Sequence, residues 1–307
     1  MEIRYVKRED IDKLKWDSCV HYAVNGNAYG YTWYLDNICE DWDGLVEGDY
    51  ESVFPLVWNT KLLGYKQLYQ PFFAQQLGLY SVRVLSEKRV KTFLEHIPDE
   101  YRYILMNLNE RMSIKSDWGF EVNPRPNYIL DLNRPYEEIA SHYSKNLKRN
   151  LKKAKKQKLF MTNSLKPEKV VSLFKTHQGP QINDLKERDY HTLHRIIYNA
   201  QHKNVGFLSG MQNQEGELIA AGFFLFSHHR ITNLLPATTP EGKEKGAMPF
   251  LLDMLILMNS GKKVIFDFEG SSIPSIARFY ASFGAKEVSF PQIKRNVLPV
   301  WMKWLRR

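Results

Sequence analysis

The sequence predicts an α/β protein with two domains. The chain has 307 residues, which is longer than one hydrophobic core usually serves, so two domains of about 150 residues are expected. Hydrophobic residues make up 43% of the chain and aromatic residues 13%, which is enough apolar material for both cores. Segments with the alternation of strands and segments with the spacing of helices follow one another through both halves. We expect the domains at residues 1–134 and 135–307.

In the first half, alternating apolar residues predict strands, and turn residues such as Glu47-Gly48-Asp49 separate them. The expected strands are Glu2–Val6, Gly44–Val46, Tyr50–Val57, Leu62–Tyr69, Tyr101–Leu108, Asp117–Val122 and Asn127–Leu132. The expected helices are Ile11–Tyr22, Ala28–Cys39 and Ser86–His96. Asp10 is the expected cap of the first helix, and Pro71–Gly78 is expected to be a loop.

A break at Asn133–Pro135 marks the expected domain junction, and a long helix is predicted after it, from Tyr136 to about Gln157. The strands expected in the second half are Leu159–Asn163, Val205–Met211, Leu218–Phe226 and Arg230–Pro236. The other helices are expected at Glu168–His177, Lys186–Lys203 and Ala247–Ser260. A polar, glycine-bearing loop is predicted at Ala237–Gly246, and Trp301–Arg307 is predicted to be a short basic helix or a loose tail.

The segment Lys262–Val288 predicts a strand, a helix and a second strand. Val264–Phe268 is apolar and is followed by Glu269-Gly270, so acidic groups lie at the exit of a buried strand. Ser271 or Ser272 can cap the helix, and Pro274 suits its first turn. Apolar side chains then recur at helical spacing at Ile276, Phe279, Tyr280 and Phe283. Gly284 stands where a left-handed C-terminal residue favours glycine, and Lys286–Phe290 has the pattern of another strand.

A weak internal repeat relates the two halves. Tyr101–Leu108 followed by Trp118–Val122 is similar to Val264–Phe268 followed by Phe283–Val288. Gly78 and Gly119 are 41 residues apart, and Gly246 and Gly284 are 38 residues apart. The first copy has no tyrosine-bearing helix before its glycine, so the second half is the better candidate for chemistry.

The composition predicts a basic, soluble, cytoplasmic protein. The net charge of +9 comes from 43 basic and 34 acidic side chains. It favours a polyanionic partner such as tRNA, a nucleotide-linked substrate, coenzyme A or anionic lipid, or it serves only solubility. Two cysteines without a CxxC motif favour a reducing compartment. The charged N-terminus is unlike a signal peptide, and the sequence has no apolar run of transmembrane length.

Tyr280, Asp267 and Glu269 are the candidate catalytic residues. A phenol can protonate a leaving thiolate or alkoxide, and a carboxylate can accept the proton of an attacking amine. Asp267 follows an apolar strand, where burial would raise its pKa. The alternative interpretation is structural: Tyr280 packs in the core, and Glu269 is a charge at the start of a helix.

The segment Glu241–Met248 is a candidate phosphate-binding loop that leads into a helix. Backbone N–H groups at a helix N-terminus attract phosphate, and small residues allow a close approach. The residues that would hold donor phosphates are Lys243, Lys245, Gly246, Ala247 and Met248. The alternative is a solvated turn before an ordinary helix.

The C-terminal half of the predicted long helix is strongly basic. Its cations are Lys145, Lys148, Arg149, Lys152, Lys153, Lys155, Lys156 and Lys158. Such a face suits a phosphate backbone, and Lys145, Lys148, Arg149 and Lys152 are the candidate polyanion-binding residues. It can equally be a solvated face, and no aromatic residue within it indicates base stacking. The histidines lack partners at metal-ligand spacing, so no metal site is predicted.

These segments resemble the GNAT-type N-acyltransferases. The run Tyr280–Val288 looks like their helix, aromatic-glycine and strand ending. The loop Lys243–Met248 stands where that family has its pyrophosphate loop, with Lys243 in place of the usual Gln or Arg. The whole chain is similar to the FemAB-like branch, which carries tandem GNAT-like domains. Tyr143–Ala154 and Phe266–Ser271 look like its junction and strand-end motifs.

The resemblance implies two tandem GNAT-like domains, each with a mixed sheet flanked by helices, and transfer of an acyl or aminoacyl group to an amine. The donor would be acyl-CoA or aminoacyl-tRNA, with no tightly bound cofactor. Lys243, Lys245 and the backbone at Gly246–Met248 would bind donor phosphates, and Tyr280 would protonate the leaving group or orient the donor. Asp267 or Glu269 would receive the amine proton or bind the acceptor.

Two other functions remain open from the sequence. The first is a FemAB-type ligase that uses aminoacyl-tRNA to extend a peptidoglycan precursor. The second is a binding protein without catalytic activity that uses the same scaffold.

Overall fold

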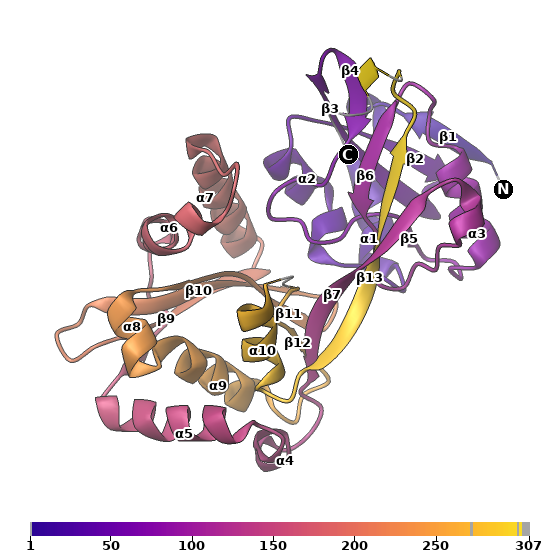
Figure 1. Cartoon of the computed structure of the whole chain (residues 1–307). Helices are drawn as coiled ribbons and strands as arrows, with labels where there is room; N and C mark the ends of the chain where they lie inside the picture. The colour runs from indigo at the N-terminus through magenta and orange to yellow at the C-terminus, as the bar shows by residue number, and fades with distance from the viewer. Residues whose placement is uncertain (1, 271–272, 300, 303–307) are drawn as a thin grey trace. The chain divides into compact units, whose positions relative to one another are not determined.

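The computed structural model describes residues 2–270, 273–299 and 301–302, and it divides the chain into two compact units (Figure 1). Unit 1 comprises Met1–Pro126 and Ser289–Arg307, and unit 2 comprises Asn127–Val288. The sequence instead places one boundary after residue 134 and assigns the whole remainder to the second domain. The division differs because β13 (Lys286–Asn296) pairs with β6 (Tyr103–Asn107) and returns the end of the chain to unit 1.

Unit 1 contains a mixed sheet. Its strands, in spatial order, are β1 (Ile3–Val6), β2 (Asp41–Glu47), β3 (Ser52–Leu62), β4 (Tyr65–Leu68), β6 and the end of β13, and β5 (Tyr80–Ser81) pairs with β3. The pairs are antiparallel except β4 with β6, which are parallel. Its helices are α1 (Lys13–Tyr22), α2 (Thr32–Ile38) and α3 (Glu87–Glu95).

The cap of α1 differs from the prediction. Asp12, rather than Asp10, accepts hydrogen bonds from the backbone N–H groups of Leu14 and Lys15, each at 3.1 Å. Asp10 lies in a preceding 3-10 turn, Arg8–Asp10. Two neighbouring aspartates offer the same capping chemistry, so the local sequence does not choose between them.

Unit 2 also contains a mixed sheet. Its strands, in spatial order, are β7 (Glu121–Asp131), β12 (Ile265–Asp267), β11 (Arg230–Thr238), β10 (Leu218–Ser227), β9 (Gly206–Gln212) and β8 (Phe160–Thr162). Only β11 and β12 pair in parallel among these described strands. The β10–β11 hairpin turns at His228-His229, both of which have positive φ, so these adjacent histidines are turn residues.

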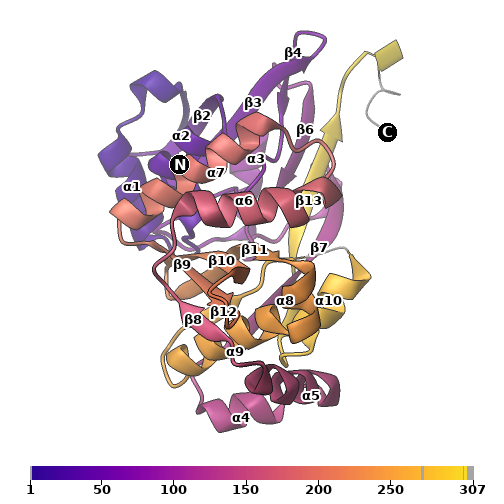
Figure 2. The same ribbon diagram turned by 90° about the vertical axis from the view of Figure 1, so that its left-hand side faces the viewer.

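Helices cover both faces of the unit 2 sheet. α6 (Pro167–His177) and α7 (Glu187–His202) lie on one face, and α9 (Ala247–Asn259) lies on the other (Figure 1). α4 (Tyr136–Ser141), α5 (Lys145–Ala154) and α10 (Pro274–Ala281) pack on the side of α9, and Figure 2 also shows α5 alongside α9. The main core of the unit therefore lies between the sheet and α9.

Two sequence predictions in this unit are wrong. The long helix Tyr136–Gln157 is interrupted at His142–Ser144, because Ser144 caps α5 by accepting the N–H of Leu147 at 3.1 Å. The expected loop Ala237–Gly246 contains a short helix, α8 (Pro240–Lys245). Thr239 caps α8 by accepting the N–H of Gly242 at 2.9 Å. A capping residue before a proline in the first turn is the signal for this helix.

The predicted unit at Lys262–Val288 forms in outline. α10 begins at Pro274, and Gly284 has the left-handed φ of +72° that was expected of it. A side chain at Gly284 would also collide with His142, because its Cβ would lie 2.9 Å from the His142 Cβ. The proposed caps Ser271 and Ser272 lie outside the described residues, as does most of the predicted segment Trp301–Arg307.

A buried carboxylate anchors α4 to α9. Asp253 is 2% exposed and accepts a hydrogen bond of 2.8 Å from the Tyr136 hydroxyl. Burial raises the pKa of Asp253 above its ordinary value of 3.8. Burial, followed by the charge of Asp253, raises the pKa of Tyr143. A carboxyl whose folded-state pKa is raised favours the folded state most when it is protonated, so this contribution is lost as the pH rises.

Replacing Asp253 with Asn should therefore have a pH-dependent effect. The neutral amide can still accept from Tyr136, and it removes the buried charge. Relative to the wild type, the free energy of unfolding of D253N should be larger at pH 7 than at pH 4, because only the wild type loses stability as its buried carboxyl ionises. Urea denaturation at both pH values measures this difference. Glu244→Gln on the surface of α8 is the control and should show no such trend. A relative stability of D253N that fell with rising pH would contradict this account.

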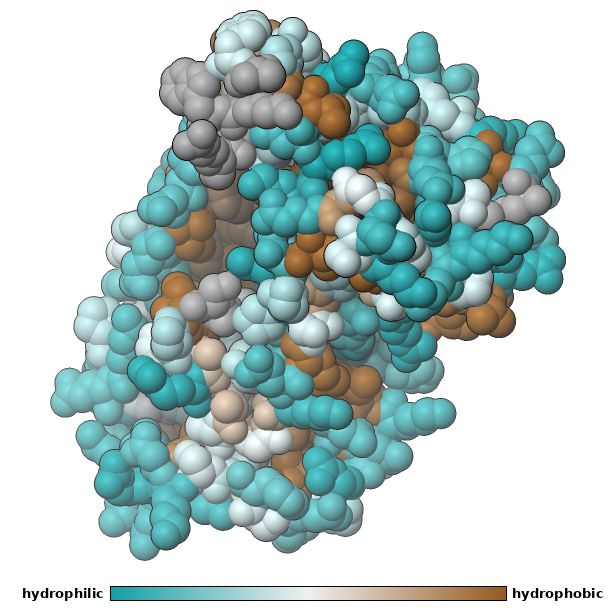
Figure 3. Space-filling view, turned by 45° about the vertical axis from the view of Figure 1, so that its right-hand side comes forward, coloured by the Kyte–Doolittle hydropathy of each residue, from teal (hydrophilic) through white to brown (hydrophobic). Residues whose placement is uncertain are grey.

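The surface seen in Figure 3 is mainly hydrophilic, with apolar residues in scattered groups. No helix among the described residues has both the length and the apolar character to cross a membrane.

Candidate active site

The parallel pair β11 and β12 separates at a defined point in unit 2. Three residue pairs join the strands, and the last is Thr232 with Asp267. β12 ends there, whereas β11 continues to Thr238. The pairing of β11 with β10 shifts between Phe223 and Phe224 and leaves Leu234 as an extra residue, and such a bulge bends a strand. The sheet therefore opens next to Asn233 on β11 and Phe268 beyond β12.

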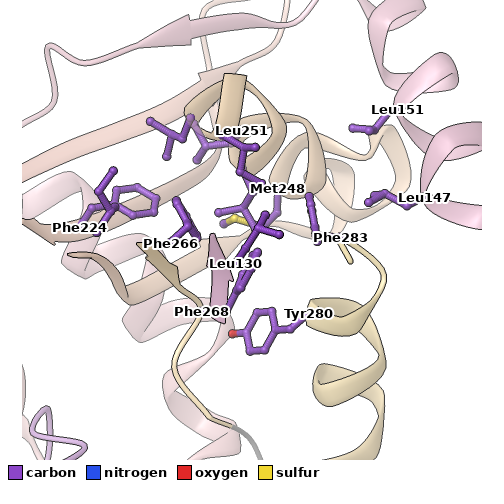
Figure 4. Packing of buried hydrophobic residues seen from close by; sticks show 14 of the residues in the cluster. Leu130, Leu147, Leu151, Phe224, Met248, Leu251, Phe266, Phe268, Tyr280 and Phe283 are labelled. Carbon is purple, nitrogen blue, oxygen red and sulfur yellow. The ribbon is translucent and has the colours of Figure 1, made fainter. Parts of the chain in front are cut away.

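The strand register assigns the candidate catalytic residues to different faces. Side chains of directly paired residues share a face, and successive residues alternate. Ile231 and Phe266 therefore lie on the α9 face, and Thr232 and Asp267 lie on the opposite face. Phe268 returns to the α9 face, where its ring centroid is 5.1 Å from that of Tyr280 (Figure 4). Asp267 and Tyr280 thus approach the strand exit from opposite sides of the sheet.

Asp267 is engaged in structural contacts. It is 3% exposed, and its Oδ2 lies 2.6 Å from the guanidinium of Arg230 on β11. Its Oδ1 accepts a 2.8 Å hydrogen bond from the backbone N–H of Glu269. These contacts fix the last rung of the strand pair and the first residues after it, so the role that the geometry supports for Asp267 is positioning.

Glu269 has an uncommon backbone conformation. Its φ is +60°, a left-handed value that typically costs a non-glycine residue about 1–2 kcal/mol. The hydrogen bond to Asp267 helps to hold it there. Its side chain is half-buried. Strained residues of this kind cluster at functional sites, and the conformation directs the chain away from β12 at the opening.

Tyr280 combines core packing with a hydroxyl at the opening. The side chain is 8% exposed and packs against Phe268, Phe279 and Tyr128. Figure 4 shows its hydroxyl directed toward the segment that follows β12. Burial, then the charge of Glu269, then that of Asp267 raise the pKa of Tyr280. The phenol therefore carries its proton at neutral pH and lies within the electrostatic reach of both carboxylates.

Three neighbours of these residues were missed by the sequence prediction. Arg230 binds Asp267, Tyr128 packs on Tyr280 and donates to Glu287 at 2.8 Å, and Asn233 lies where the strands separate. All three come from strands that are remote in sequence from α10. Only the strand register brings them together, so no local pattern could have identified them.

The candidate phosphate-binding residues differ in accessibility. Gly246 has a φ of +70° and joins α8 to α9. Ala247 and Met248 are buried, so only their backbone groups could meet a ligand. Lys245 pairs with Glu241 at 2.7 Å, and Lys243 is exposed on α8. Pro249 lacks an N–H in the first turn of α9, which leaves fewer donors at that end.

The basic helix α5 lies directly beside this segment. A Cβ at Gly246 would be 3.4 Å from the Cβ of Ala154 and 3.7 Å from the carbonyl oxygen of Asn150. Leu147, Leu151 and Ala154 are buried against unit 2. The candidate polyanion-binding residues are exposed: Lys145, Lys148, Arg149 and Lys152. In the described part of the chain, none of these four forms an ion pair with a carboxylate. The basic helix α5 and the end of α8, which are distant in sequence, therefore lie side by side.

Unit 1 has a related opening that its own chain closes. β4 and β6 pair in parallel over only two residue pairs. The chain after β4 then returns to β6: Leu77 donates to the Asn107 carbonyl at 2.9 Å and forms a parallel bridge with Leu108. The side chain of Gln70 accepts the N–H of Asn107, also at 2.9 Å. The edge of β6 is thus occupied, and unit 2 is the better candidate for a site.

The comparisons with known proteins agree on the fold. No family model matches the sequence, and no curated protein matches it. The solved structure of FemX is similar over 99% of both chains, with a TM-score of 0.72 and 11% identity. A protein of unknown function from Bacteroides thetaiotaomicron has a TM-score of 0.59 and 10% identity, over 92% of this chain and 96% of that one. L-PGS from Bacillus licheniformis has a TM-score of 0.56 and 12% identity, over 96% and 95%.

The predicted fold class is confirmed by these comparisons. The chain shares its fold with FemX, and each of its two units has a mixed sheet with flanking helices. Sequence identities of 10–12% establish the shared fold alone. The chemistry therefore has to be argued from the residues at the opening.

Proposed function

We propose that the protein transfers an acyl or aminoacyl group from an activated donor to an amine, at the opening between β11 and β12. The observation that carries this proposal is the convergence of Tyr280 and Glu269 on the end of β12, where the parallel strands part. The fold shared with FemX and with L-PGS supports the same class of reaction.

In the proposed reaction, the amine attacks the donor carbonyl and forms the new C–N bond, and the bond to the carrier breaks. The amine loses one proton and the leaving group gains one. Glu269 is the proposed proton acceptor, directly or through water, and the Tyr280 phenol is the proposed proton donor. Asp267 takes a supporting role, because Arg230 and the N–H of Glu269 already occupy its oxygens. Holding donor and amine together supplies much of the rate enhancement in such a reaction.

The surface formed by α5, Lys243 and the N-terminus of α9 is the proposed site for the phosphates of the donor. The cations of α5 that form no ion pair with a carboxylate in the described part of the chain extend along the helix. A helix rises about 1.5 Å per residue, so the face of α5 is longer than a single pyrophosphate. This observation favours a polyanionic carrier such as aminoacyl-tRNA over acyl-CoA.

Titration calorimetry with acetyl-CoA and with charged tRNA tests the identity of the donor. We expect the charged tRNA to bind more tightly at low salt. Tighter binding of acetyl-CoA would assign the alternative donor. If neither ligand bound, the transferase proposal would be contradicted and a non-catalytic scaffold favoured.

Replacing Tyr280 with Phe should slow turnover at least tenfold, because it removes the proposed proton donor but keeps the ring that packs on Phe268. Loss of one general acid commonly costs about 10²-fold or more. Turnover with the donor that binds, together with a thermal melt, measures both effects. The melting temperature should change little, since the hydroxyl lies at the edge of the core. Unchanged turnover in a folded Y280F protein would exclude this role.

Replacing Lys145, Lys148, Arg149 and Lys152 with Ala together should weaken tRNA binding and reduce its salt dependence. Each phosphate contact contributes about 0.7–0.9 to the slope of log K against log salt, so four contacts account for about three. A matched control removes four exposed cations of unit 1: Lys7, Lys61, Lys88 and Arg102. Equal effects of the two variants on affinity and slope would show that only net charge matters.

A further inference from the structure

Asn233 is an unusual buried residue. It is 1% exposed, and neither its side-chain Nδ2 nor its Oδ1 has a hydrogen-bond partner among the residues that the structure describes. Buried polar groups are nearly always paired, because leaving one unpaired forfeits the hydrogen bonds it made to water. Asn213, which is equally buried, shows the normal case: its Nδ2 donates to Glu217 and Glu241, and its Oδ1 accepts the N–H of Glu217.

The position of Asn233 is the start of the opening. It follows Thr232, the last residue of β11 that pairs with β12, and precedes the bulged Leu234. It pairs with Phe224 on β10 and lies two residues after Ile231, so its side chain is on the α9 face. Tyr280 and Phe268 belong to the hydrophobic cluster on that face, which also contains Phe224 and Ile231 (Figure 4). Had β12 continued in register, Phe268 would have faced Asn233.

The surroundings offer Asn233 little within the protein. The neighbours that the register places on its face are Phe224, Ile231 and Phe266, all apolar and buried. A bridging water needs two to four polar partners, and these side chains supply none. An apolar residue of the same size would fit the fold better, since it would leave no amide unpaired.

We infer that Asn233 binds the acyl group of the donor, an inference that rests on the proposed transferase function. An amide side chain donates through Nδ2 and accepts through Oδ1. Its complement is a group that presents an acceptor and a donor side by side, as an α-amino carbonyl or an amide does. Nδ2 would donate to the carbonyl oxygen and Oδ1 would accept the neighbouring N–H. A plain acyl group such as acetyl would leave Oδ1 unpaired, so Asn233 selects against it.

Asn233→Leu tests the inference because stability and binding should change in opposite directions. The melting temperature of N233L should equal or exceed that of the wild type, since no internal hydrogen bond is lost. Asn213→Leu is the matched control and should lower the melting temperature by several degrees, because it breaks a paired network. Thr232→Val, the neighbour on the opposite face, controls for a local change in β11. A melting temperature of N233L that fell as far as that of N213L would overturn the inference.

The binding measurement uses two matched probe pairs, alanyl-tRNA with uncharged tRNA and acetyl-CoA with coenzyme A. Within each pair the carrier contacts cancel, so the ratio of the two Kd values reports the acyl group alone. For the wild type we expect the alanyl group to improve the Kd at least tenfold, N233L to lose this gain, and T232V to retain it. An alanyl gain that N233L retained, or a gain seen only with acetyl, would overturn the role of Asn233 while leaving the transferase proposal intact. If neither carrier bound the wild type, both the transferase proposal and the role of Asn233 would be contradicted.

Discussion

The last rung between β11 and β12 is the constraint on which the site depends. There, the buried carboxylate of Asp267 pairs with Arg230 and holds the N–H of Glu269. Breaking one side of a buried pair typically costs about 3–5 kcal/mol, because the remaining charge is left without compensation. The Thr232–Asp267 pair is therefore held firmly, and the two strands separate at the next residue of each. Glu269 takes its left-handed conformation at that exit.

The two units show how one topology can be open or closed. Each unit has a short parallel pair beside antiparallel strands, as the weak sequence repeat suggests. In unit 1, the segment around Leu77 pairs with the edge of β6 and satisfies its backbone groups. In unit 2, the matching region contains α8, and β11 extends past the end of β12. The difference lies in the course of the chain after the first strand of the pair, and it supports the choice of unit 2 for the proposed site.

The contact of α5 with Gly246 joins two features that have no connection in the sequence. The small residues Ala154 and Gly246 allow the helix and the loop to approach closely. The cations of α5 then lie beside the N-terminus of α9, and the apolar side of α5 is used for packing. The proposed phosphate-binding surface depends on this contact, because it brings α5 next to the residue that precedes α9.

The sequence by itself determined the α/β class, most of the strands and helices, and the strand, helix and glycine at Lys262–Val288. These depend on local signals: the alternation of apolar residues, Pro274 at a helix start and Gly284 at a left-handed residue. The sequence also contained signals that were overlooked, such as Thr239-Pro240 before α8 and Ser144 before α5. The domain division differed, because the pairing of β13 with β6 joins segments far apart in the chain.

Only the tertiary structure decided which of the candidate residues meet. Asp267 and Tyr280 are close in sequence, yet strand alternation directs Asp267 to one face of the sheet, whereas α10 packs Tyr280 against Phe268 on the other. Arg230 and Asn233 reach the opening from a strand more than thirty residues away. The physical reason is that a strand's side-chain direction depends on its register with a partner, and register is a property of two segments, which no single stretch of sequence specifies.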